Sequence, residues 1–164
     1  MKNEWYDFME AIVLEEVKKL EWYAVFEKVT QIINYVWVNF SSLLGWELAE
    51  LKFKLSWYKY FLSDFVGELQ RLSRFYSLDI ESQCNNIILE ESDRVRKLLG
   101  KISWIEREEI KDRAKDSLYN LSCKQLLYEN YYYKYKVKMS AIDDVITTIT
   151  QRISDLKRQM DNWI

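Results

Sequence analysis

The sequence predicts an all-α protein, and its composition supports this in three ways. The 164 residues include no proline and three glycines, whereas an average chain of this length holds roughly eight prolines. Proline and glycine break helices and build tight turns, so a β-sandwich or a doubly wound sheet is a poor fit. Hydrophobic residues (49%) and charged residues (30%) are balanced as in a folded chain. We expect a single α-helical domain over residues 1–164, a helical hairpin or bundle with a long C-terminal coiled-coil-like helix.

The first two helices are predicted from apolar residues spaced alternately by four and three. One face of residues 22–40 carries Trp22, Phe26, Val29, Ile33, Val36 and Phe40. After a short polar break, ten apolar positions continue this spacing from Leu44 to Tyr76. Ser41 or Ser42 can cap the second helix, because a serine hydroxyl accepts a bond from a free N–H of the first turn. A short break makes the two helices antiparallel, so residues 1–76 are predicted to form an N-terminal helical hairpin.

Residues 77–102 lack a long apolar ladder and contain Asn85, Asn86 and a cluster of acidic residues at 90–93. This segment is predicted to be an irregular connector with short helices. Ser103 and Glu106 then have the spacing of a capping box, in which each side chain accepts a bond from a backbone N–H near the other. We expect one long helix to begin there and to fill residues 103–164.

The long helix carries the strongest periodic pattern in the chain. Fifteen positions from Ala114 to Trp163 alternate steps of four and three, and Gln125 is the only polar residue among them. A period of 3.5 kept over roughly seven heptads implies supercoiling against a partner helix. The second helix, the connector or another subunit has to cover the part of this seam that extends beyond the first helix. We expect a homo-oligomer, with the following seam residues in its C-terminal part: Tyr132, Tyr135, Met139, Ile142, Ile146, Ile149, Ile153, Leu156, Met160 and Trp163.

Residue types needed for most catalysis and metal binding are scarce. The chain has no histidine, and Cys84 and Cys123 are far apart without metal-type spacing. Glu106, Glu108 and Glu109 could hold Mg²⁺, but acids are favoured in the first turn of a helix by its dipole alone. No catalytic residue, metal site or cofactor is predicted, and an enzyme is not expected. Reduced cysteines suit a cytoplasmic protein.

The net charge of −2 excludes a globally basic nucleic-acid binder but allows a local basic stripe. Lysines alternate with tyrosines from Tyr131 to Lys138, a pattern suited to single-stranded nucleic acid. Tyr131 and Tyr133 are candidate base-stacking residues. The candidate phosphate contacts are Lys134 and Lys136, together with Lys124, Lys138 and Arg152, which share one heptad position. Alternatively, Tyr132 and Tyr135 belong to the seam and the lysines are a solvated flank.

The C-terminal segment from Asp143 to Arg152, continuing through Ile153, Leu156, Lys157 and Trp163, resembles the closing helix of the phage UvsY-type recombination mediators. The tyrosines at 128–135 lie where that family tends to carry aromatics. Residues 37–39, Ser41, Ser42 and Glu47 look like its helix–turn–helix. The resemblance implies a non-enzymatic oligomer that binds single-stranded DNA and helps load a RecA-like recombinase. It also implies phosphate contacts by Arg152, Lys157 and Arg158.

Three functions remain open from the sequence. The first is a viral recombination mediator, which would act in the host bacterial cytoplasm if the chain is phage-encoded. The second is a viral adaptor or inhibitor that binds a host or viral protein through an aromatic helical face, without nucleic acid. Abundant Trp and Tyr favour this reading, because both are common interface anchors. The third is a structural bundle alone. The uncharged stretch 29–46 is too polar for a membrane span, so no membrane partner is expected.

Overall fold

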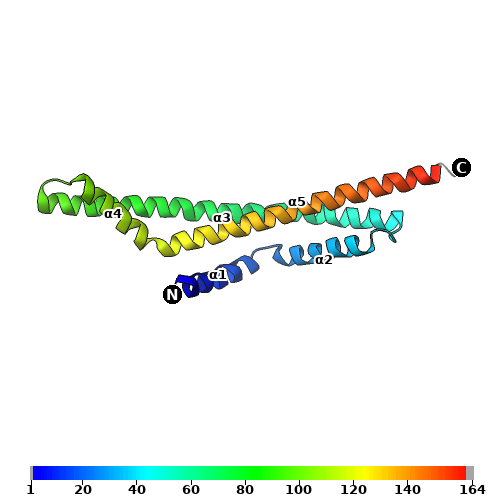
Figure 1. The fold of residues 1–164 in the computed structure, drawn as a ribbon, viewed down its shortest axis with the longest axis horizontal. Helices are drawn as coiled ribbons and strands as arrows, with labels where there is room; N and C mark the ends of the chain where they lie inside the picture. The colour runs from blue at the N-terminus through cyan, green and yellow to red at the C-terminus, as the bar shows by residue number, and fades with distance from the viewer. Residues whose placement is uncertain (1, 162–164) are drawn as a thin grey trace. The chain divides into compact units, whose positions relative to one another are not determined.

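The computed structural model describes the backbone of residues 2–161 and the side chains of residues 5–161. Within these residues the protein is all-α, which confirms the predicted fold class (Figure 1). Five helices follow one another without a strand in the described part of the chain. They are α1 (Lys2–Lys18), α2 (Tyr23–Asn39), α3 (Gly45–Leu99), α4 (Trp104–Ser117) and α5 (Tyr119–Asp161).

The chain forms two compact units, and α3 and α5 contribute to both of them. Unit 1 comprises Met1–Leu14 and Leu69–Asn130, and unit 2 comprises Glu15–Glu68 and Tyr131–Ile164. Each unit buries its own set of apolar side chains. The single domain expected over residues 1–164 stays a prediction.

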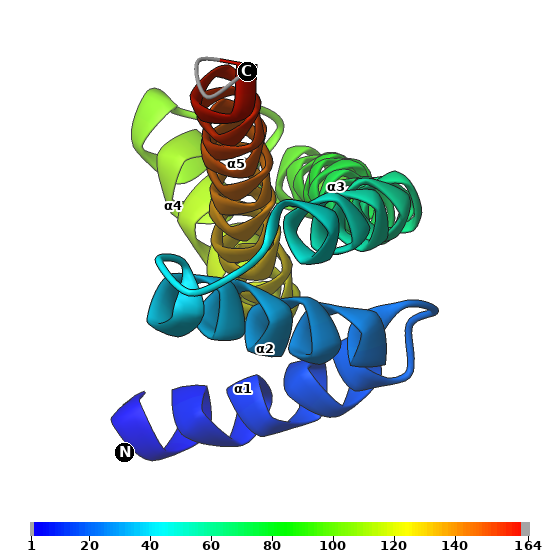
Figure 2. The same ribbon diagram turned by 90° about the vertical axis from the view of Figure 1, so that its right-hand side faces the viewer.

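Unit 2 is built from α2, the first half of α3 and the second half of α5, which lie side by side (Figures 1 and 2). The periodic residues of α2 and α3 form its core, as their spacing predicts: Phe26, Val29, Val36, Leu48, Leu55, Leu62 and Phe65 are all buried. Phe26, Phe65 and Tyr135, one from each helix, join their rings at centroid distances of 4.7–5.4 Å. Lys59 of α3 and Asp143 of α5 form an ion pair at the edge of this core.

Unit 1 contains the first part of α1, the second half of α3, α4 and the start of α5. Its buried residues include Met9, Val13, Ile110, Ala114 and Leu127. Tyr76 of α3 and Tyr128 of α5 stack with centroids 5.5 Å apart and ring planes at 10°.

The predicted irregular connector over 77–102 is wrong, because α3 continues without interruption to Leu99. This part of the helix has no long row of apolar residues, and polar side chains stabilise it through hydrogen bonds and ion pairs. Gln83 donates to the Asp79 carboxylate, and Arg94 and Arg96 pair with acids three residues earlier. Gly100 ends the helix with a φ of 71°, and its N–H donates to the carbonyl of Arg96.

The predicted single helix over 103–164 is divided in two. Ser103 and Glu106 form the expected capping box, with Glu106 N to Ser103 Oγ at 3.2 Å and Ser103 N to Glu106 Oε2 at 2.7 Å. The helix that starts there stops at Ser117. The N–H of the buried Leu118 donates to the carbonyl of Lys115, a tight turn that separates α4 from α5.

Two details of the N-terminal half also differ from expectation. Ser42 does not cap α3, because its hydroxyl donates to the carbonyl of Asn39 at the end of α2. The Leu44 N–H is instead satisfied by the Glu47 carboxylate at 2.8 Å. In addition, α1 forms a helix of its own before the predicted hairpin. Trp22 at the α1–α2 turn has a φ of 72°, which is unusual for a tryptophan.

Candidate functional site

A row of exposed aromatic side chains in unit 2 lies on α3, on the side away from its buried ladder. Trp46, Phe53, Trp57 and Tyr60 have exposed fractions of 66, 72, 52 and 72%. At 100° per residue these four positions fall within about 60° of arc on the helix. They face roughly opposite to the buried residues Leu48, Leu55 and Leu62. We call these four residues the outer face of α3.

Sequence reasoning missed the outer face, although its signal was present. Residues 46, 50, 53, 57, 60 and 64 alternate steps of four and three, as the buried ladder does. Four of the six are aromatic, and the others are Glu50 and Asp64. Glu50 pairs with Lys54 at 2.6 Å and stays on the surface. The apolar residues from Leu44 to Tyr76 were sufficient to predict the helix, so the aromatic residues on its other side were interpreted as scattered.

Rings on α3 hold part of the outer face in place. The Trp57 ring meets Phe61 edge-on at 4.5 Å, and Tyr60 meets Phe61 at 5.4 Å with planes at 90°. Phe61 in turn packs against Trp22 at 4.5 Å. Trp57 and Tyr60 are therefore positioned by neighbours while much of each side chain remains exposed. Rings that are fixed before binding lose less conformational entropy when a partner covers them.

The tyrosine–lysine segment of α5 forms a second candidate surface. Lys134, Lys136 and Lys138 lie over the rings of Tyr131, Tyr132 and Tyr135, at 5.6, 5.5 and 5.3 Å from the ring centroids. These are cation–π contacts between residues one helical turn apart. Residues 130–142 contain three lysines and no acid. Lys134 and Lys136 are exposed, so this stretch of α5 is locally cationic.

The base-stacking prediction is wrong for Tyr131. Its side chain is 7% exposed, and its ring lies 6.4 Å from that of Tyr135 with planes at 21°. A nucleic-acid base cannot reach a ring that already belongs to the core. Tyr133 is 54% exposed, and its candidate role stays a prediction.

The other predicted phosphate contacts are dispersed. Lys124 lies in unit 1, 5.1 Å from the Tyr76 ring. Arg158 is exposed, and its Nη1 lies 3.9 Å from Asp155 Oδ1. Arg152 and Lys157 line one groove near the end of α5. Within unit 2 the predicted cations are therefore divided between the tyrosine–lysine segment and the end of α5, and their roles stay predictions.

The predicted oligomer seam divides into two groups. Tyr135, Ile142 and Ile149 are at most 4% exposed within their own chain, so they are core residues and not an intermolecular seam. The cause is that α5 packs against both α2 and α3 and buries a wider face, which includes the unpredicted Val145. The remaining residues are half-buried or, for Met160, exposed: Tyr132, Met139, Ile146, Ile153, Leu156 and Met160. Trp163 lies outside the described residues.

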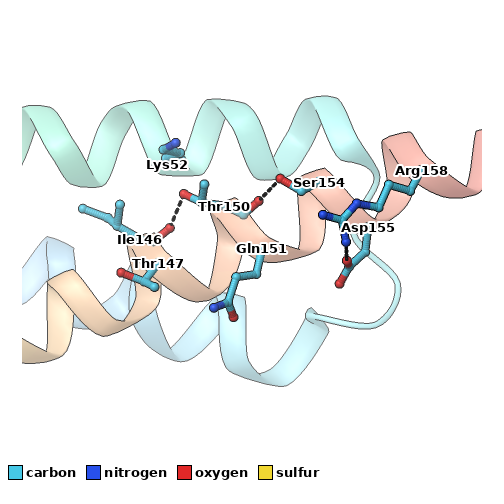
Figure 3. A pocket seen from close by; sticks show the side chains of 8 residues that line it. All are labelled: Lys52, Ile146, Thr147, Thr150, Gln151, Ser154, Asp155 and Arg158. Atoms are coloured by element: carbon cyan, nitrogen blue, oxygen red, sulfur yellow. Dashed lines mark hydrogen bonds and ion pairs between the residues drawn. The ribbon is translucent and has the colours of Figure 1, made fainter.

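A small hollow of about 410 Å³ lies between α3 and α5 (Figure 3). Two of its three hydroxyl groups are engaged by the helix itself: Thr150 Oγ1 donates to the Ile146 carbonyl at 2.7 Å, and Ser154 Oγ donates to that of Thr150 at 3.1 Å. Asp155 points toward Arg158, as Figure 3 shows. The hollow thus offers two hydroxyl groups already bonded to backbone, the hydroxyl of Thr147 and one salt-bridged carboxylate. No activated nucleophile is assembled from these residues.

A larger groove, about 1030 Å³, lies where the turn between α2 and α3 faces the end of α5. Its apolar lining is Leu43, Leu44, Ala49, Ile153, Leu156 and Met160. Arg152 and Lys157 supply its charge. We call it the C-terminal groove.

The titration of Tyr135 reflects the aromatic core and not a catalytic arrangement. Burial among rings and a hydrogen bond with the Tyr23 side chain raise the pKa of Tyr135 far above its ordinary value. The described residues contain no cluster of three or more metal-ligating side chains, and both cysteines are free thiols. Over the same part of the chain, no helix combines the length and apolar character needed to cross a bilayer.

Comparison of the chain with known protein families, with curated proteins and with solved structures finds no match. The resemblance to UvsY-type mediators therefore stays a prediction from the residues alone.

Proposed function

We propose that this chain is a non-enzymatic helical protein that binds another protein through the outer face of α3. The observation that carries the proposal is the row of four exposed aromatic side chains, Trp46, Phe53, Trp57 and Tyr60. Large exposed apolar patches are uncommon on monomeric proteins and mark interaction sites. The function is that of an adaptor or inhibitor presenting an aromatic helical face.

The chemistry of the outer face favours a protein partner. The four positions span 15 residues, or about 21 Å of helix, a length suited to one partner helix or groove. Trp and Tyr are enriched among the residues that dominate binding energy in protein interfaces. The polar members of the row are Glu50, which pairs with Lys54, and Asp64, so the row itself offers no cation to a nucleic-acid backbone.

The proposal is tested by affinity capture from cells that express the tagged chain, after nuclease treatment. We expect one stoichiometric protein to be recovered with the wild-type chain and lost with the double variant Phe53→Ser/Tyr60→Ser. Both replaced side chains are exposed, so the fold should be unaffected. The matched control is Tyr35→Ser/Val38→Ser, which removes exposed apolar side chains from α2. Recovery of the same proteins with all three chains would refute the proposal.

Single-stranded DNA binding by α5 is a second candidate function, as the mediator resemblance implies. It is favoured by one observation, the exposed Lys134 and Lys136 beside the half-exposed Tyr133 in a stretch without acids. Each subunit would supply few phosphate contacts, so useful affinity would require several subunits on one strand. Loading of a RecA-like recombinase is a further step of the same proposal.

Fluorescence anisotropy with a labelled oligonucleotide at low salt separates the two candidates. DNA binding predicts an anisotropy increase that declines steeply with salt and is weakened by Lys134→Gln/Lys136→Gln. The matched control is Lys97→Gln/Lys101→Gln, which removes two exposed lysines from unit 1. No binding at low salt would exclude this second function and leave the first untouched.

A further inference from the structure

We propose that the C-terminal groove binds α1 of a second copy of this chain, so that subunits join head to tail. The inference is independent of the function assigned to the outer face of α3, which takes no part in it. It starts from a groove lined by apolar side chains and two cations, Arg152 and Lys157.

The apolar part of the groove is only partly covered within its own chain. Met160 is 69% exposed and Leu44 57% exposed, while Ile153 and Leu156 are half-buried. These α5 residues continue the predicted seam, and nothing within the described residues buries them fully. Covering them would remove substantial apolar surface from water, which favours association.

The charged part of the groove indicates what the occupant must carry. Arg152 and Lys157 line it, and within residues 5–161 neither forms an ion pair. The Arg152 Nε is shielded from solvent and has no hydrogen-bond acceptor in the described part of the chain. A buried donor without an acceptor is costly, so an occupant with carboxylates beside apolar side chains is favoured. Two grooves placed face to face would instead oppose like charges.

The exposed face of α1 has this combination. Phe8 is 61% exposed and Ile12 37% exposed, and they lie one helical turn apart. Residues 5–19 contain four acids (Asp7, Glu10, Glu15 and Glu16) and two bases, Lys18 and Lys19, and Lys18 pairs with Glu15 at 2.8 Å. Acids therefore outnumber bases around this apolar face, the reverse of the groove.

Other exposed apolar surfaces of the chain fit less well. Leu98, Leu99, Trp104 and Ile105 lie at the α3–α4 turn, where residues 93–109 contain five bases and four acids. That surface has no excess of acids to offer the cations of the groove. The exposed residues of α2 between 31 and 40 lie in a stretch without any charge. The outer face of α3 lies in residues 46–64, which contain three acids and three lysines. Of the surfaces compared, α1 carries the largest excess of acids, and charge complementarity favours it as the occupant.

Because groove and α1 face are different surfaces, the contact is heterologous and leaves one of each unoccupied in a dimer. Larger rings or filaments follow as the concentration rises. This differs from a twofold dimer, in which one surface pairs with itself.

The test uses two variants that each remove one side of the contact, Met160→Asp in the groove and Phe8→Asp on α1. Both side chains are exposed, and circular dichroism checks that helicity is retained. Light scattering and native mass spectrometry should show wild-type mass rising with concentration, while each variant alone stays monomeric. Mixed in equal amounts, the variants should give a one-to-one heterodimer of doubled mass and nothing larger, because one intact contact remains.

Three results would overturn the inference. They are a wild-type chain that stays monomeric at every concentration, a mixture that stays monomeric, and a Phe8→Asp variant that dimerises by itself. The last would indicate pairing of two grooves. Phe53→Ser/Tyr60→Ser should assemble as the wild type does, so failure of this inference and failure of the proposed function are distinguishable.

Discussion

The ring of Tyr135 stands edge-on against that of Phe65, with centroids 5.0 Å apart and planes at 85°. This pair joins α5 to α3 at the centre of unit 2, and Phe26 adds a ring from α2. Edge-to-face contacts add to the stabilisation that burial provides. The hydroxyl of Tyr135 is held in the same core by a hydrogen bond with Tyr23.

Tyr135→Phe should change the pH dependence of stability. Burial raises the pKa of Tyr135 in the folded state, so above about pH 10 the unfolded chain loses a proton that the folded chain keeps. The contribution of the protonated Tyr135 hydroxyl to stability is therefore fully present below about pH 10 and decreases as the pH rises. Tyr135→Phe should lower the free energy of unfolding by about 1 kcal/mol at pH 8, because its hydrogen bond is lost. Urea unfolding at about pH 8 and pH 11 should then show a smaller decrease in the free energy of unfolding between the two pH values for this variant than for the wild type. Tyr133→Phe, at an exposed position of α5, should retain the wild-type dependence; equal slopes for all three proteins would contradict this account.

Trp22→Gly should be more stable than Trp22→Ala by about 1 kcal/mol. Both replacements remove the ring that packs on Phe61, so this loss cancels in the comparison. What remains is the backbone, because a φ of 72° is strained for alanine and readily adopted by glycine. Thermal unfolding of both variants measures the difference. An alanine variant as stable as the glycine variant would mean that the turn relaxes without strain.

Two glycines should respond in opposite directions to alanine. Gly67 lies within α3 and an added Cβ meets nothing within 4 Å, so Gly67→Ala should stabilise by about 0.5–1 kcal/mol. Gly100 has a φ of 71°, so Gly100→Ala should destabilise by about 1 kcal/mol although space is available. Denaturant midpoints compare them. If both variants changed the free energy of unfolding in the same direction, the backbone conformation at these positions would not determine the effect of the added methyl group.

The two faces of α3 should differ in their contribution to stability. Leu62→Ala removes a fully buried side chain and should cost about 2–5 kcal/mol. Phe53→Ser/Tyr60→Ser removes more apolar surface from the outer face but should cost within about 1 kcal/mol, because surface changes have small effects. Urea unfolding of the isolated chain measures both. A large loss in the outer-face variant would mean that these rings are packed within the protein.

The period of the apolar residues predicted the buried side of α2 and α3 well, since Phe26, Leu48 and Leu62 are buried where the spacing places them. It failed over 77–99, where ion pairs and hydrogen bonds within the helix replace the apolar ladder. The period also does not indicate which partner covers α5. Ile142 and Ile149 look the same in the sequence whether their own chain or another subunit buries them.

The candidate surfaces were harder to predict than the fold. Tyr131 and Tyr133 are two residues apart in one sequence pattern, yet one is core and the other is open to solvent, because the helix turns 200° between them. The outer face of α3 was hidden in a helix that one ladder already explained. Exposure depends on which neighbours a helix acquires, and spacing alone does not specify those neighbours.

The central claim is that α3 has one covered apolar face and one free apolar face. The most direct measurement is the rate at which single cysteines react with a maleimide, placed at Phe53→Cys, Tyr60→Cys and Leu62→Cys in a Cys84→Ser/Cys123→Ser background at low protein concentration. The account predicts rapid labelling at positions 53 and 60 and strong protection at position 62. Protection of positions 53 and 60 equal to that of position 62 would contradict it.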